Sequence, residues 1–108
     1  WNYQIDNSEG LQYTVYDLNG KYEWHVDRDI VAPMENMRKL TVICQLSSID
    51  EFSGGGLFIR HKDRITGSLL SEQGDVVVIP SYIEHRVGEV TNGRRITAVM
   101  WATGKPFT

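Results

Sequence analysis

The sequence predicts an all-β fold, either a sandwich or a jelly roll, on three observations. Short segments rich in β-branched and apolar side chains recur along the chain, for example at 40–44 and 75–79. Glycine, proline and asparagine separate these segments at a spacing of roughly 8–12 residues, which is typical of antiparallel sandwiches. Only one stretch, 30–39, has a pattern compatible with a short helix, and Pro33 interrupts it.

Three strands are expected in the N-terminal half. Residues 14–16 and 22–26 flank Leu18-Asn19-Gly20, whose residue types favour a turn. Residues 40–44 are apolar and β-branched, which indicates a buried strand. The short helix expected at 30–39 would lie between the second and third of these strands.

Three more strands are expected in the C-terminal half. The run Ser53-Gly-Gly-Gly56 breaks regular structure just before residues 57–59, which form the first of them. Residues 75–79 form the next, and a proline ends it. Residues 95–101 alternate polar and apolar side chains and complete the set. No repeat or internal boundary is visible, so residues 1–108 are expected to form a single domain.

Composition argues against two classes of partner. The net charge of −3 makes a nucleic-acid surface unexpected, and no apolar run approaches the roughly 20 residues of a membrane span. The single Cys44 cannot form an internal disulfide and no signal peptide is visible, so a cytoplasmic location is expected. Because the chain starts at Trp1 and not at methionine, we expect a processed or trimmed piece of a longer protein.

Two histidines and one aspartate have the spacing of a metal site. On a strand, residues i and i+2 point to the same face, so His25 and Asp27 converge on one point. His85 follows the strand at 75–79 and can approach from a neighbouring segment. Two imidazoles and one carboxylate cover one face of an octahedral ion and leave three positions open, which is the ligand set of non-haem Fe(II) oxygenases. The alternative for each histidine is a hydrogen-bonded core or rim residue.

A second His-x-Asp pair, His61 and Asp63, has the same spacing. It lies within 60–64, a run of five charged or polar residues that is typical of a solvated hairpin. It also precedes His85 by only 24 residues (85 − 61), against 60 for His25 (85 − 25). Twenty-four residues leave little room for the strands that bring ligands together, so we assign His61 and Asp63 to the surface.

Arg95, which carries a fixed positive charge, follows His85 in the sequence. Arg95 and Thr97 share one strand face, whereas Arg94 points the other way and is assigned to the surface. A guanidinium stays charged in proteins and pairs bidentately with carboxylates, so an inward-facing Arg95 requires an anionic partner. Thr97 adds a hydroxyl donor to the same site. The alternative is that both arginines are surface residues after the turn at 91–93.

Five motifs in the correct order resemble the 2-oxoglutarate and Fe(II)-dependent dioxygenase superfamily, nearest its prolyl 4-hydroxylase-like branch. Each motif is weak alone, and the resemblance covers nearly the whole chain, from about Leu11 to Trp101. It implies a double-stranded β-helix, a cupin-like jelly roll, without the N-terminal helices that normally precede this core. The segments that carry it are Tyr16–Asp27, Arg38–Leu46, Phe52–Leu57, Gln73–Pro80 and His85–Val90.

The resemblance also implies roles for particular residues. It makes His25, Asp27 and His85 the Fe(II) ligands, with O2 and 2-oxoglutarate as co-substrates and ascorbate as an accessory cofactor. The implied reaction hydroxylates an unreactive C–H bond and releases succinate and CO2. The residues placed against 2-oxoglutarate are Arg95, Thr97, Tyr16 and Gln45, of which Gln45 stands where the branch often has a tyrosine.

Several side chains near these residues are expected to be structural. Tyr22 falls on the strand face opposite His25 by simple alternation, so we interpret it as a packing residue. Trp24 and Trp101 are interpreted as core residues, with the wall of the pocket as the alternative. Cys44 is expected to be a buried structural thiol.

No motif specifies the prime substrate. Loops on a rigid barrel usually carry specificity, so residues 28–38 and 47–53 are expected to face it. The branch is associated with a peptidyl proline, while other peptides, free amino acids and small metabolites stay open. Two other functions also stay open: a cupin-type metal dioxygenase that has no use for Arg95, and a non-catalytic module that binds metal or 2-oxoglutarate.

Overall fold

The computed structural model describes residues 5, 7–27, 30–31, 36–67 and 72–104. Regular structure in these ranges consists of strands and one 3-10 turn, η1 (Ile49–Glu51), which confirms the predicted all-β class. Across the same ranges, no helix is long and apolar enough to cross a membrane. The strands are β1 (Asn7–Ser8), β2 (Gln12–Tyr16), β3 (Tyr22–His25), β4 (Ile30–Val31), β5 (Asn36–Gln45), β6 (Phe52–Gly54), β7 (Leu57–His61), β8 (Arg64–Thr66), β9 (Val76–Pro80), β10 (Glu84–Val87), β11 (Val90–Gly93) and β12 (Arg95–Gly104).

The larger layer is a six-stranded antiparallel sheet built around β5 and β12. These two ten-residue strands pair from Thr97↔Gln45 to Gly104↔Met37. β2 and β1 pair with the other edge of β12, and β9 and β4 pair with the other edge of β5. Residues of β5 and β12 that are register partners share a face, so their side chains form rows across the sheet.

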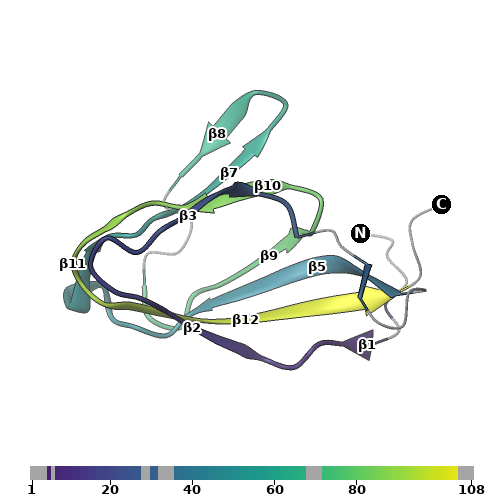
Figure 1. Ribbon diagram of the computed structural model, residues 1–108, viewed down its shortest axis with the longest axis horizontal. Coiled ribbons are helices and arrows are strands. Elements are labelled where there is room, and N and C mark those ends of the chain that lie inside the picture. Colours follow the sequence, from purple (N-terminus) through teal and green to yellow (C-terminus); the bar gives the residue numbers. More distant parts are fainter. Residues whose placement is uncertain (1–4, 6, 28–29, 32–35, 68–71, 105–108) are drawn as a thin grey trace.

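The second layer is the four-stranded sheet β3-β10-β7-β8, and the ribbon formed by β6 and β11 lies at one end of the molecule. Figure 1 shows the two layers facing each other, with the β7–β8 hairpin projecting beyond them. The strand pairs described within and between these sheets are antiparallel. This architecture is the predicted double-stranded β-helix, or jelly roll.

The predicted turn at 18–20 carries the chain from one layer to the other. Asn19 adopts a φ of 69°, and the amide of Gly20 donates to the carbonyl of Asp17 at 2.7 Å. β2 before the turn pairs with β12, whereas β3 after it pairs with β10. The turn therefore places Tyr16 and His25 on opposite walls of the space between the layers.

The interior between the layers is unusually polar for a small domain. Its apolar part is a cluster of Ile43, Leu57 and Val87, extended by half-buried neighbours such as Val77 and Val99. Because a buried polar group is costly without a partner, a polar interior is more typical of a binding site than of a packing core. The polar side chains that are at most 1% exposed are Thr41, Gln45, Ser81, Arg95 and Thr97.

The expected short helix at 30–39 is wrong. Residues 30–31 form β4, and residues 36–39 begin β5. The two strands pair with each other through Ile30↔Met37 and Val31↔Asn36. Pairing with a neighbouring strand has overridden the local preference, as tertiary context often does. Pro33 lies outside the described residues.

Gly93 is a position where the fold depends on glycine, and we expect Gly93→Ala to destabilise the protein. Its φ is +73°, and an added Cβ would lie 1.9 Å from the carbonyl oxygen of Glu51. The left-handed backbone alone costs an alanine about 1–2 kcal/mol, and the clash adds to this. We therefore expect a loss of at least about 2 kcal/mol in the free energy of unfolding, measured by urea denaturation.

Gly10→Ala is the matched control for Gly93→Ala. An added Cβ at Gly10 meets nothing within 4 Å, and its backbone is not left-handed. This variant should unfold at the wild-type urea concentration or slightly above it. Equal midpoints for the two variants would contradict the role given to Gly93.

Candidate metal centre

The structure brings the three predicted metal ligands together between the layers. His25 on β3 and His85 on β10 are register partners, with ring centroids 4.2 Å apart. The backbone amide of Asp27 donates to the carbonyl of Ser81 at 2.8 Å, which fixes the segment after β3 against the segment before β10. One ligand atom from each of the three residues can be chosen so that all lie within 4.8 Å of one another.

The ligand atoms are spaced as a metal ion requires. Nε2 of His25 lies 3.4 Å from Oδ1 of Asp27, and Nε2 of His85 lies 3.2 Å from Oδ2. Two ligands at right angles around an ion with bonds of about 2.1 Å lie roughly 3 Å apart. The site therefore fits a first-row divalent metal with little adjustment.

Both imidazoles are held in the orientation that a metal ligand needs. Nδ1 of His25 donates to the carbonyl of Glu23 at 2.7 Å, and Nδ1 of His85 donates to the carbonyl of Ile83 at 3.0 Å. With Nδ1 carrying the proton, each Nε2 can present a lone pair to a metal ion. Each histidine accordingly has a backbone partner that fixes its ring.

The carboxyl of Asp27 is held ionised. Burial works to raise its pKa, but hydrogen bonds from His25, His85 and Trp101 outweigh burial and hold the pKa well below its ordinary value. Burial also works to lower the pKa of His85, yet its hydrogen bond to Asp27 raises that pKa above the ordinary value. A metal ion bound at this place would displace any proton shared by His85 and Asp27, since metal ligands must be deprotonated.

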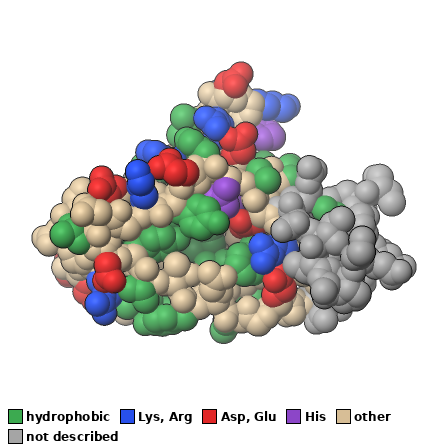
Figure 2. Space-filling view, viewed as in Figure 1, with side chains coloured by type: hydrophobic (Ala, Val, Ile, Leu, Met, Phe, Trp, Pro, Cys, Tyr) green, Lys and Arg blue, Asp and Glu red, His purple; other side chains and the backbone are tan. Residues whose placement is uncertain are grey.

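A cavity of about 250 Å³ opens beside these three residues. It is lined by the ligands themselves and, deeper between the layers, by Tyr16, Arg95 and Thr97. Figure 2 shows hydrophobic side chains gathered along the band between the two layers, with a histidine and an acidic side chain in the same band. The predicted metal ligands therefore share one cavity with three of the four residues predicted to bind 2-oxoglutarate, Tyr16, Arg95 and Thr97.

Arg95 is buried with unused hydrogen-bonding capacity. Its side chain is 1% exposed, and within the described part of the chain its Nη1 and Nη2 atoms have no hydrogen-bond partner. Burial lowers the pKa of Arg95, and nearby Tyr16 works against this change. The guanidinium carbon lies 5.4 Å from the centre of the Tyr16 ring. A buried guanidinium without a partner is costly, so a carboxylate ligand would satisfy it.

Gln45 is also buried with unused hydrogen-bonding capacity. It is fully buried, and neither atom of its side-chain amide has a partner among the described residues. Gln45 is the register partner of Thr97, so the two residues are neighbours on one face of the large sheet. Its side chain is not among those that line the cavity.

The residues assigned to the surface are found there. His61 and Asp63 are exposed, at the turn of the β7–β8 hairpin, where Lys62 and Asp63 have φ values of 50° and 65°. Arg94 is exposed and its Nε donates to Asp17 at 2.8 Å. None of these residues takes part in the metal centre.

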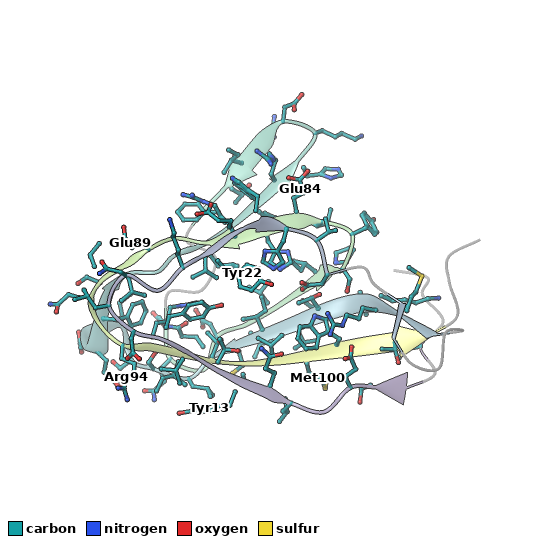
Figure 3. The ribbon with its side chains drawn as sticks, in the orientation of Figure 1. Tyr13, Tyr22, Glu84, Glu89, Arg94 and Met100 are labelled. Atoms are coloured by element: carbon teal, nitrogen blue, oxygen red, sulfur yellow. The ribbon has the colours of Figure 1, made fainter. Side chains whose placement is uncertain are left out.

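Tyr22 was expected to pack on the opposite face from His25, and this is wrong. The register of β3 against β10 shifts between His25↔His85 and Tyr22↔Val87, so three residues of β3 span two of β10. This bulge turns Tyr22 to the same side as His25, and the two ring centroids are 3.8 Å apart. Tyr22 lines the cavity, and Figure 3 shows it between the layers, whereas Tyr13 lies on the outside.

Two further residues beside the metal centre were not predicted to contact it. Trp101 lines the cavity, and its indole Nε1 donates to Oδ2 of Asp27 at 3.1 Å. The alternative interpretation of Trp101, as part of the wall of the pocket, is therefore confirmed. Thr41 donates from Oγ1 to the same oxygen at 2.9 Å. Strand alternation along 40–44 was the sequence signal that could have placed Thr41 on the inward face. Trp24 packs instead against Arg60 and Arg86.

Of the two segments expected to face the substrate, 28–38 contributes a residue to the cavity and 47–53 contributes none. Arg38 lines the cavity, while residues 28–29 and 32–35 lie outside the described residues. No residue of 47–53 lines the cavity. Ser48 instead caps η1 in that segment, where its amide donates to Glu51. Cys44 is half-buried and not fully buried as expected.

Comparison with known proteins places this geometry in a family. The 2OG-Fe(II) oxygenase superfamily model matches residues 11–103. A PKHD-type hydroxylase from Synechococcus sp. strain CC9605 is 35% identical over 80 residues, covering 74% of this chain and 35% of that protein. The chain thus spans about a third of the length of that relative.

Solved structures agree on the fold. A viral collagen prolyl hydroxylase from Paramecium Bursaria Chlorella virus-1, solved with 2-oxoglutarate, has a TM-score of 0.74 at 19% identity, covering 93% of this chain and 61% of that one. A cupin domain from Bordetella pertussis has a TM-score of 0.59 at 13% identity, covering 94% of this chain and 86% of that one. With the family match over most of the chain, these findings show that the protein belongs to the 2OG-Fe(II) oxygenase superfamily.

Proposed function

We propose that this chain carries the catalytic core of a non-haem Fe(II) and 2-oxoglutarate-dependent oxygenase that hydroxylates a C–H bond of its substrate. The observation that carries the proposal is one cavity with two distinct ends. At one end lie His25, Asp27 and His85. At the other lies the buried guanidinium of Arg95, whose terminal nitrogens have no partner among the described residues.

His25, Asp27 and His85 are proposed to hold Fe(II). Bound there with 2-oxoglutarate, the iron would supply activation of O2 for hydroxylation, with release of succinate and CO2. The protein's own contribution is to fix the ligands, through the backbone carbonyls behind both imidazoles and the hydrogen bonds to Asp27. Three ligands on one side leave the opposite coordination positions for co-substrates.

Arg95, Thr97 and Tyr16 are proposed to bind the far carboxylate of 2-oxoglutarate. Arg95 would form a charge-assisted pair with it, which removes the cost of the unpaired guanidinium. Burial raises the pKa of Tyr16, so its phenol stays protonated and can donate a hydrogen bond. Thr97, which is 1% exposed, offers a hydroxyl from the same face of β12 as Arg95.

Gln45 is proposed to complete this end of the pocket, and Gln45→Leu should weaken 2-oxoglutarate binding. Its amide has no partner among the described residues and lies beside Thr97 in register. Removing a hydrogen bond to a charged group costs about 1.5–3 kcal/mol, which corresponds to roughly 10–100-fold in the dissociation constant. Calorimetry with Mn(II)-loaded protein measures this change. An unchanged dissociation constant would show that Gln45 does not reach the co-substrate.

The walls of the cavity are suited to keep water from the reacting groups. Ile43, Leu57, Val87 and Val99 line it between the metal end and the arginine end. Apolar walls strengthen the electrostatic contacts within the pocket, because they lower the local dielectric constant. This supports selective binding of a dicarboxylate that spans both ends.

A peptidyl proline is the proposed prime substrate. The viral structural neighbour is named as a collagen prolyl hydroxylase, and the fold likeness to it extends over 93% of this chain. Tyr22 and Trp101 add aromatic surface at the metal end of the cavity, which suits the packing of a proline ring. Proline-containing peptides are therefore the first substrates to test, with free amino acids and small metabolites next.

Succinate release tests the proposed function. The protein should form succinate from 2-oxoglutarate only when Fe(II) and O2 are both present, with ascorbate included to keep the iron reduced. Succinate formation that needs no Fe(II) would contradict the proposal. Oxygenation of a substrate without use of 2-oxoglutarate would favour the cupin-type dioxygenase, and binding of both ligands without turnover would favour a non-catalytic module.

A further inference from the structure

The two oxygens of the Asp27 carboxylate have different surroundings. Oδ2 accepts hydrogen bonds from Thr41 Oγ1 at 2.9 Å and from Trp101 Nε1 at 3.1 Å. Oδ1 lies 3.4 Å from Nε2 of His25, and Oδ2 also lies 3.2 Å from Nε2 of His85. Thr41 and Trp101 are register partners on β5 and β12, in the layer opposite β3 and β10, which carry the histidines. Both oxygens thus face a histidine, and among the described residues the hydrogen bonds from the large sheet go to Oδ2 and not to Oδ1.

The number of carboxylate oxygens on the metal matters for this type of site. A carboxylate can bind a metal through one oxygen or through two. A second oxygen would take one of the three positions that two histidines and one aspartate leave open. An oxygen that already accepts two directed hydrogen bonds in a buried site has little capacity left for a metal ion.

We infer that Thr41 and Trp101 are positioning residues that hold Asp27 in a one-oxygen binding mode through Oδ1, and so keep a coordination position free. The inference rests on the proposed function, because it takes His25, Asp27 and His85 as the metal ligands. Thr41 and Trp101 act through Asp27 and not on the metal itself.

Both donors are held in place by further contacts. Oγ1 of Thr41 lies 3.0 Å from Oγ of the fully buried Ser81, whose backbone amide donates to Lys39 at 2.8 Å. A hydroxyl with two fixed neighbours has little freedom to turn away from Asp27. The Thr41 hydroxyl on β5 is therefore fixed by Ser81, which follows β9.

The indole of Trp101 is fixed from its other side. The guanidinium of Arg38 lies over the Trp101 ring at 3.9 Å, which is a cation–π contact. Arg38 in turn donates to both carboxylate oxygens of Glu9, from Nε at 2.7 Å and from Nη2 at 3.1 Å. The chain of contacts Glu9–Arg38–Trp101–Asp27 thus extends from the segment before β2 to the metal centre.

Manganese affinity tests this inference without any turnover. Thr41→Val and Trp101→Phe each remove one donor and keep most of the side-chain shape. Loss of an outer partner of a metal ligand typically costs 10–100-fold in metal affinity, so each variant should bind Mn(II) about 10–100-fold more weakly in calorimetry. Thr41→Ser keeps the hydroxyl and should restore affinity to within a few-fold of wild type. The Mn(II)-loaded variants should also bind 2-oxoglutarate more weakly, since a two-oxygen carboxylate competes with it.

Thr103→Val is the matched control. Thr103 is a buried threonine on β12 that does not line the cavity, so its variant should keep wild-type Mn(II) affinity.

If wild-type protein bound no metal, the proposed function itself would fail, and this inference with it. If wild type bound Mn(II) and both donor variants bound it equally well, the inference alone would be overturned. If Thr41→Val and Trp101→Phe unfolded at lower urea concentrations but kept wild-type Mn(II) affinity, the inference would also be overturned, because Thr41 and Trp101 would then have only a structural role.

Discussion

Replacing His25 by alanine is expected to weaken Mn(II) or Fe(II) binding by more than about 100-fold and to abolish succinate release. Loss of an outer partner already costs 10–100-fold, and loss of a ligand costs more. The fold should survive, because His25 is half-buried at the end of β3 and lies outside the apolar cluster. Calorimetry measures metal binding, and a succinate assay measures turnover. Asp27→Ala should behave in the same way.

His61→Ala is the control for the His25 variant. His61 has the same His-x-Asp spacing but is exposed in the β7–β8 hairpin, away from the cavity. Its replacement should leave metal affinity and succinate release at wild-type values. Normal turnover in His25→Ala, or a loss in His61→Ala equal to that in His25→Ala, would refute the ligand assignment.

Arg95→Met is expected to have opposite effects on stability and on co-substrate binding. In the unliganded protein the buried guanidinium has no partner for its Nη atoms among the described residues. Replacing buried charge by an apolar side chain of similar length often stabilises a fold by about 1–4 kcal/mol, and we expect a gain in this range. The same variant should lose 2-oxoglutarate binding, because the partner of its far carboxylate is gone.

Urea denaturation with and without 2-oxoglutarate measures both effects. In the presence of Mn(II), a ligand at 100 times its dissociation constant stabilises wild-type protein by about 2.7 kcal/mol, and the Arg95→Met variant should gain nothing. Arg94→Met is the control, since Arg94 is exposed and its change should stay within about 0.5 kcal/mol. A 2-oxoglutarate-dependent gain in Arg95→Met equal to wild type would rule out the proposed carboxylate contact.

The sequence was sufficient to predict the fold class and the grouping of His25, Asp27 and His85. Strand alternation is a local rule, and it holds for His25 and Asp27 because they are only two residues apart. The distant His85 was predictable because a strand with a clear end precedes it. The inward orientation of Arg95 followed from alternation along β12, and the structure confirms it with 1% exposure.

The same rule failed for Tyr22, where the strand carries an irregularity. The bulge in β3 reverses the orientation of Tyr22. A second shift, between Ala102↔Leu40 and Thr103↔Arg38, skips Lys39. Arg38 lines the cavity, as expected for the segment 28–38. Bulges depend on pairing with a partner strand and have no reliable signal in one sequence. The prediction of a helix at 30–39 was wrong for a related reason, since the pairing of β4 with β5 determines the structure of the residues in these two strands.

Anaerobic titration with Fe(II) and 2-oxoglutarate tests the three-ligand centre and its buried arginine most directly. We predict a visible charge-transfer absorption that saturates at one equivalent of each ligand, is absent in His25→Ala, and requires far more 2-oxoglutarate in Arg95→Met. A wild-type protein that develops no such absorption at saturating Fe(II) and 2-oxoglutarate would contradict the account. So would a His25→Ala variant that develops the absorption at wild-type concentrations.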